Sequence, residues 1–204
     1  MNDTQKTIEN YLSLVKDTID KLDRAQIEKT AEAFMRVYHA EKTIYIFGNG
    51  GSAASATHAC GDFVKGASYG LQKRFKVMSL VDNLPALMAI ANDLSYDDIF
   101  VEQLKNFLQP GDLVIGISGS GNSKNVINAM EYAKEKGVQT IAFCGHKGGK
   151  IKEIADIAVH SVAMDMEVAE DIHMMVFNII KKEVMRRLHG GNTSMGATYD
   201  ARVK

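Results

Sequence analysis

The six residues from Ser118 to Ser123, Ser-Gly-Ser-Gly-Asn-Ser, constrain the fold of this chain more than any other stretch. Residues 113–117, which follow Asp112, are apolar and largely β-branched, which is typical of a strand buried on both faces. Residues 124–136 follow with the spacing of an amphipathic helix. A buried strand that turns through a short loop into a helix is the unit of a parallel sheet covered by helices. The sequence therefore predicts an α/β protein.

The composition of this loop predicts a phosphate site. Backbone N–H groups at a helix start carry partial positive charge. Ser118, Ser120 and Ser123 add hydroxyl donors, and Gly119 and Gly121 let the backbone approach a bulky anion. The alternative is an ordinary turn, in which a serine caps the helix and the glycines bend the chain. Three serines and two glycines exceed what capping needs, so we favour a phosphate monoester as the ligand.

A second strand–turn–helix unit lies earlier in the chain. Residues 43–47 read as a buried strand, Gly48–Ser52 as a glycine-rich turn, and residues 53–64 as a helix. One glycine-rich turn is weak evidence for a site. Two such turns after parallel strands open on the same sheet edge, where α/β proteins bind their ligands. Asn49, Gly50 and Ser52 are therefore candidate substrate contacts.

The remaining elements complete a single domain. Residues 4–40 predict two helices, further strands are expected at 74–81, 139–145 and 157–162, and further helices at 85–92, 95–108, 150–155 and 167–188. The alternation predicts a three-layer, doubly wound fold, with a five-stranded, mainly parallel sheet flanked by helices. We expect one domain over residues 1–189 and a flexible tail over residues 190–204.

Charge and cysteine content narrow the functional classes. The 204 residues carry a formal net charge of −1, which gives no support for a nucleic-acid or anionic-membrane partner. No apolar run is long enough to span a bilayer, and the first residues lack a signal-peptide profile. Cys60 and Cys144 have no disulfide or zinc spacing. We therefore expect a cytoplasmic protein with a small-molecule ligand.

Two pairs of ionisable residues are candidates for proton transfer. His58 and Asp62 are four residues apart on one predicted helix, and Glu170 and His173 are three apart on another, so each pair shares a helix face. Imidazole and carboxylate groups suit general acid–base catalysis, and the same donors suit a divalent metal. The alternative for the two histidines is a hydrogen-bonded place inside a subunit interface.

The motifs together resemble those of the sugar isomerase (SIS) domain family, and within it the phosphoheptose isomerases. The matching segments span residues 5–188, and they are Gly48–Ser52, Ala91–Asp93, Gly111–Asp112, Ile117–Ser123, Gly148–Lys150 and Glu170–His173. The resemblance implies a flavodoxin-like SIS fold and a homotetramer. It also implies conversion of sedoheptulose 7-phosphate to a heptose 7-phosphate.

The resemblance assigns roles to individual positions. Phosphate binding falls on Ser118, Gly119, Ser120 and Ser123, and sugar contacts fall on Asn49, Ser52 and Asp93. Three positions depart from the family pattern: Asp62 stands for the general-base Glu, Glu170 for a Gln, and Asn178 for a His. Asp62, Glu170 and His173 are the predicted catalytic residues. Some relatives bind zinc, which implies His58, Asp62 and Glu170 as ligands for a Zn²⁺ ion and requires no organic cofactor.

Two functions from different classes remain open. The first is a phosphosugar aldose–ketose isomerase whose sites are shared between subunits of a homotetramer. The second is a noncatalytic phosphosugar-binding or regulatory protein, since a relative that binds the replication initiator DnaA also has Asn at the position of Asn178. Asp62, Glu170 and His173 favour the enzyme, because a scaffold does not need clustered ionisable groups.

Overall fold

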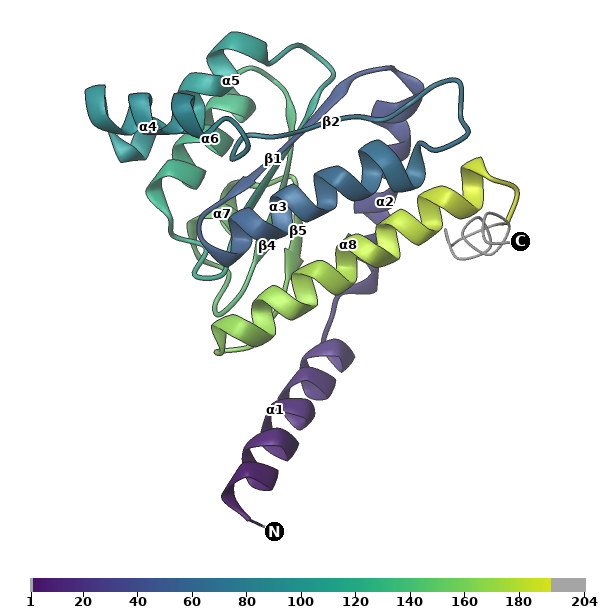
Figure 1. Cartoon of the computed structure of the whole chain (residues 1–204), viewed down its shortest axis with the longest axis vertical. Coiled ribbons are helices and arrows are strands. Elements are labelled where there is room, and N and C mark those ends of the chain that lie inside the picture. Colours follow the sequence, from purple (N-terminus) through teal and green to yellow (C-terminus); the bar gives the residue numbers. More distant parts are fainter. Residues whose placement is uncertain (1, 192–204) are drawn as a thin grey trace.

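The computed structural model describes residues 2–191, so almost all of the predicted tail, residues 190–204, lies outside the described residues. One sheet forms the centre of the molecule, and all of its strand pairs are parallel (Figure 1). Its order is β2-β1-β3-β4-β5. The strands are β1 (Thr43–Gly48), β2 (Lys76–Ser79), β3 (Leu113–Ser118), β4 (Gln139–Cys144) and β5 (Ile157–His160).

Helices cover both faces of the sheet and make three layers (Figure 1). The first face carries α2 (Arg24–His39), α3 (Gly51–Gly61) and α8 (Met166–Leu188). The second carries α5 (Val101–Phe107), α6 (Lys124–Glu135) and α7 (Gly149–Ile154), with α4 (Leu84–Asp93) at its edge. The predicted doubly wound α/β fold is therefore confirmed. Among residues 2–191, no helix is long and apolar enough to cross a membrane.

The sheet brings both glycine-rich turns to one edge. Strand β3 is central and is buried at every residue, as its apolar sequence predicts. Gly48, the last residue of β1, is paired with Ile117 next to the end of β3. The turns that follow these two strands therefore lie side by side at the carboxyl edge, where the helices α3 and α6 begin.

Helix α1 (Asp3–Asp20) extends beyond the three layers, but its Tyr11 hydroxyl donates to the Asp171 carboxylate of α8 at 2.7 Å, and α2 also packs against α8 (Figure 1). Ile8 and Leu12 on α1 are about half exposed.

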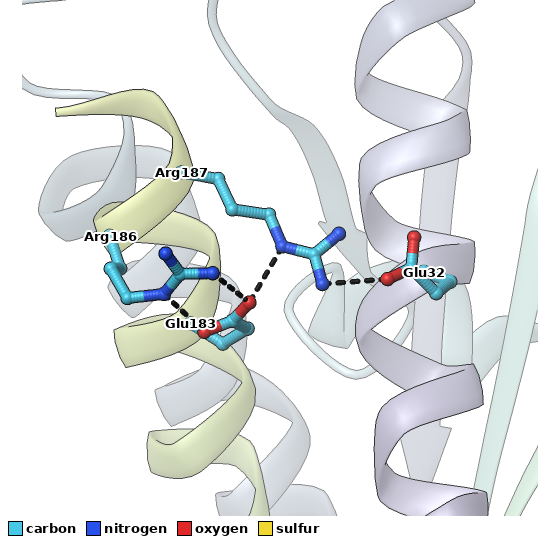
Figure 2. Close-up of polar contacts among 4 residues, drawn as sticks. All are labelled: Glu32, Glu183, Arg186 and Arg187. Atoms are coloured by element: carbon cyan, nitrogen blue, oxygen red, sulfur yellow. Dashed lines mark hydrogen bonds and ion pairs between the residues drawn. The ribbon is translucent and has the colours of Figure 1, made fainter. Parts of the chain in front are cut away.

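Figure 2 shows the ion pairs near the C-terminal end of α8. Arg187 joins Glu183 of its own helix to Glu32 of α2, with N–O distances of 2.7 and 2.6 Å. These ion pairs thus join α2 and α8 within one layer, while α1 offers an apolar surface.

Two predicted helices differ from the observed ones. The prediction of a single helix over residues 95–108 is wrong: a 3₁₀ turn, Tyr96–Asp98, precedes α5. The break lets Phe100 stack on Phe47, at a centroid distance of 4.9 Å, in the core. The predicted helix 53–64 continues as a π-helix over Asp62–Ala67. Strand β2 is also shorter than the predicted 74–81.

Candidate functional site

Three serine hydroxyls converge in the loop between β3 and α6. The Ser118 Oγ lies 3.0 Å from the Ser123 Oγ and 3.4 Å from the Ser120 Oγ. Ser123 occupies the N-cap position of α6, yet its side chain makes no capping hydrogen bond. Its hydroxyl instead contacts the Ser118 hydroxyl. Capping therefore does not explain this serine, and the arrangement suits a phosphate group at a helix N-terminus.

Neighbouring helices fix the shape of this serine loop. Gly121 has φ +70°, and a Cβ there would meet the carbonyl oxygen of Gly148 at 1.9 Å. The N–H of Ile151 in α7 donates to the Gly121 carbonyl at 3.0 Å. Gly119 is buried against Met166, the first residue of α8. The serine loop is thus packed against the starts of α7 and α8 before any ligand binds.

A pair of asparagines joins the two turns. Asn49, in the turn after β1, and Asn125, in the first turn of α6, exchange two amide hydrogen bonds of 2.9 Å each. The Tyr96 hydroxyl also donates to the Asn49 Oδ1, at 2.9 Å. In the same turn Gly50 has φ +55°, and Ser52 is 4% exposed at the start of α3. The predicted contacts Asn49, Gly50 and Ser52 therefore lie beside the serine loop.

The Glu170 carboxylate lies against the start of α3. A Cβ on Gly51 would come within 2.1 Å of the Glu170 Oε2, so the carboxylate lies directly against the Gly51 backbone. Glu170 is about one helical turn beyond Met166, which packs on the serine loop. Burial raises the pKa of the Glu170 carboxyl, and the nearby carboxylates of Glu167 and Asp171 raise it further. A carboxyl with a raised pKa beside the glycine-rich turn after β1 is a candidate acid or base.

Asp62 and His58 lie in a different place from Glu170. The Asp62 Oδ2 is 3.6 Å from the His58 Nε2, as the four-residue spacing predicts. The other oxygen, Oδ1, is 2.5 Å from the Nζ of Lys181 on α8. Because a helix rises about 1.5 Å per residue, Asp62 is roughly 15 Å along α3 from Gly51 and its Glu170 neighbour. Within one chain the structure does not bring Asp62 and Glu170 together.

His173 faces the core instead of the molecular surface. Its side chain is 0% exposed and meets the Phe143 ring edge-on at a centroid distance of 5.8 Å. Within the described part of the chain, neither ring nitrogen has a hydrogen-bond partner; the Cys144 carbonyl is nearby but outside hydrogen-bonding geometry. Burial lowers the pKa of His173 to about 4. This position favours a structural role, and we do not carry the predicted catalytic role of His173 into our proposal.

The buried His173 predicts a specific pH dependence of stability. Its pKa is lowered in the folded state, so between pH 6.5 and 4 the unfolded chain binds a proton that the folded chain does not. The stabilising contribution is complete above pH 6.5 and is lost as the pH falls toward 4. We expect the wild type to lose about 2 kcal/mol more than His173→Leu between pH 8 and pH 5 in urea unfolding. Equal losses in the two proteins would contradict the assigned burial.

Asp93 lies apart from the serine loop. It is the exposed last residue of α4, and its Oδ1 accepts a 2.7 Å hydrogen bond from its neighbour Asn92. Between α4 and the turn after β1 there is a hollow of about 350 Å³, lined by Asn49, Gly50, Met88 and Tyr96 among others. Asp93 is not among its lining residues. The role of Asp93 as a sugar contact stays a prediction.

The donor groups of one chain do not fit a zinc ion. His58 and Asp62 are close, but Glu170 lies against Gly51, and the Lys181 ammonium already contacts the Asp62 carboxylate. A cation at Asp62 would have to displace this like charge. Across residues 2–191, no group of three or more His, Cys, Asp or Glu side chains is placed to hold a metal. We derive no chemical step through a metal.

Three residues of this region were not predicted from the sequence. They are Asn125, Tyr96 and Lys181. Asn125 is 1% exposed and precedes the buried Val126. A polar residue at such a buried position of an amphipathic helix could have been noticed in the sequence. Nothing local marks Tyr96 or Lys181, because their partners are distant in the sequence.

Comparison with known proteins identifies the family to which this chain is similar. A model of the SIS domain matches residues 8–145. The chain is 36% identical to a probable phosphoheptose isomerase of Thermoplasma volcanium, over 85% of this chain and 88% of the relative. It is also 36% identical to a phosphoheptose isomerase of Sulfurimonas denitrificans, over 81% and 84%. The structure of the phosphoheptose isomerase GmhA from Neisseria gonorrhoeae superposes with a TM-score of 0.80 and 26% identity, over 89% of this chain and 96% of that one.

Proposed function

The chain belongs to the SIS domain family and, within it, to the phosphoheptose isomerases, and on that premise we propose that it converts sedoheptulose 7-phosphate to a heptose 7-phosphate. One observation carries the proposal: Met166 packs on a preformed loop of three converging serine hydroxyls, and Glu170, a carboxyl whose pKa is raised, follows one turn later on the same helix. The loop suits the phosphate, and the carboxyl suits proton transfer at the sugar.

The reaction moves one proton between two neighbouring carbons and another between their oxygens. A base removes the proton from the carbon next to the carbonyl, and the carbonyl oxygen gains a proton, which gives an enediol. The other carbon then gains a proton, and its neighbour's hydroxyl loses one as the new carbonyl forms. No oxidant or reductant is consumed. Glu170 and Asp62 are the carboxylates that we assign to these transfers, while Ser118, Ser120 and Ser123 hold the phosphate at the other end of the sugar.

We further propose a homotetramer in which Glu170 of one subunit and Asp62 of another serve the same site. The separation of roughly 15 Å along α3 within one chain supports a shared site. A hollow of about 500 Å³ between α1, α2 and α8, lined by Ile19, Leu22, Ile27, Met175 and Ile179 among others, offers an apolar surface for a second copy. The half-exposed Ile8 and Leu12 on the projecting α1 extend this surface. Light scattering at micromolar concentration measures the assembly, and a monomer would contradict it.

The function is tested by incubating the wild-type protein with sedoheptulose 7-phosphate and following the aldose by coupled assay or NMR. We expect turnover, and we expect saturable binding in calorimetry. Binding without turnover of any six- or seven-carbon sugar phosphate would overturn the isomerase and favour the phosphosugar-binding alternative.

The same assay tests the role of zinc. Because Lys181 occupies the Asp62 carboxylate, we expect turnover to change by less than about twofold after dialysis against a chelator or after addition of zinc. A loss of activity that zinc restores would show instead that His58 and Asp62 bind the ion with a ligand from another subunit.

A further inference from the structure

Lys181 makes a contact that neither the resemblance nor the proposed mechanism uses. Its Nζ lies 2.5 Å from the Asp62 Oδ1, across the interface between the π-helix and α8. Both side chains are largely buried, with exposed fractions of 19% for Lys181 and 22% for Asp62. Exposed ion pairs hold their geometry weakly, whereas a pair shielded from water is held firmly once it is formed.

The backbone around this pair is shaped to admit the lysine. Asp62 begins the π-helix Asp62–Ala67, and such irregular turns are frequent at functional sites. Gly66 follows one turn later and is buried. A Cβ on Gly66 would come within 2.8 Å of the Lys181 Cε, so the lysine stem passes directly over this glycine. The glycine therefore leaves room for Lys181 in its observed conformation.

The ion pair distinguishes the two oxygens of Asp62. Oδ1 is occupied by Lys181, whereas Oδ2 faces His58 at 3.6 Å, which is too long for a hydrogen bond. The His58 side chain is 62% exposed, so this side of the carboxylate opens to the molecular surface. Lys181 thus holds the carboxylate with one oxygen directed outward, as a proton acceptor must be.

We propose that Lys181 is a positioning residue for the reaction: it fixes Asp62 so that Oδ2 takes part in proton transfer. This proposal rests on the isomerase function. An aspartate held by a shielded cation samples fewer rotamers, so its second oxygen keeps one orientation. Proton transfer by a side chain depends on such a fixed orientation.

The test compares Lys181→Met, Lys181→Arg and Lys182→Met. Lys182 is the exposed neighbour on the same helix, so its replacement removes the same charge without touching Asp62. We expect Lys181→Met to lower kcat by about 100-fold with little change in sugar-phosphate affinity. We expect Lys181→Arg to recover part of the loss, because it keeps the cation, and Lys182→Met to behave as wild type.

Mixed assemblies separate positioning from a purely structural role. Lys181→Met subunits mixed with Glu170→Gln subunits should regain activity, since some sites then combine an intact Asp62–Lys181 pair with an intact Glu170. Lys181→Met mixed with Asp62→Asn should regain none, because every Asp62–Lys181 pair is then damaged. A Lys181→Met protein with wild-type kcat would overturn the proposal, as would recovery in the second mixture. Absence of wild-type turnover would instead overturn the isomerase function itself and, with it, the role of Lys181.

Discussion

Replacing Ser120 and Ser123 together by alanine is expected to weaken binding of the sugar phosphate by at least about 100-fold. Both hydroxyls point toward the Ser118 Oγ, within 3.0 to 3.4 Å, where a phosphate group would meet all three. Each hydrogen bond to a charged group contributes about 1.5–3 kcal/mol, so the loss of two produces an effect of this size. Isothermal titration calorimetry with sedoheptulose 7-phosphate measures the affinity directly.

The fold is expected to survive this double substitution. Ser120 and Ser123 are half-buried, and the shape of the serine loop depends on Gly121 and on the contacts of α7 and α8. We expect the Tm to change by no more than about 3 °C. Ser13→Ala, at an exposed position on α1, is the matched control and should bind as wild type. Unchanged affinity in a folded double variant would show that the phosphate binds elsewhere.

The second large effect concerns the two carboxylates. Asp62→Asn and Glu170→Gln keep the size of each side chain but remove its ability to accept a proton. We expect each to lower turnover by about 100-fold or more while leaving sugar-phosphate affinity within about threefold, since the serine loop is untouched. Asn178→Ala, an exposed neutral position on α8, should have a much smaller effect and is the control.

Mixing the two inactive variants tests whether the site is shared between subunits. If Asp62 and Glu170 of different chains form one site, random mixing restores both carboxylates in about a quarter of the sites. The activity of the mixture should then rise to about that fraction of the wild type. If each chain supplied both carboxylates of its own site, the mixture would stay inactive. Wild-type turnover in both single variants would contradict the assignment of these carboxylates.

Local sequence determined the fold class and the serine loop. The apolar run of β3, the Ser-Gly-Ser-Gly-Asn-Ser loop and the amphipathic α6 are consecutive, and each is specified by its own side chains. Parallel strands then leave little choice of topology, because the crossovers must be right-handed and the turns must open on one edge. Ser118, Ser120 and Ser123 could thus be predicted as neighbours without a structure.

Tertiary packing decided what local patterns could not show. His173 has the same spacing from Glu170 whether it faces solvent or the sheet, and only the packing of α8 on Phe143 directs it into the core. The break before α5 goes together with the stacking of Phe100 on Phe47, a contact between segments far apart in the sequence. Lys181 meets Asp62 only because α3 and α8 lie side by side on the sheet. Contacts between residues far apart in the sequence depend on how all the helices pack on the sheet, so no short stretch of sequence encodes them.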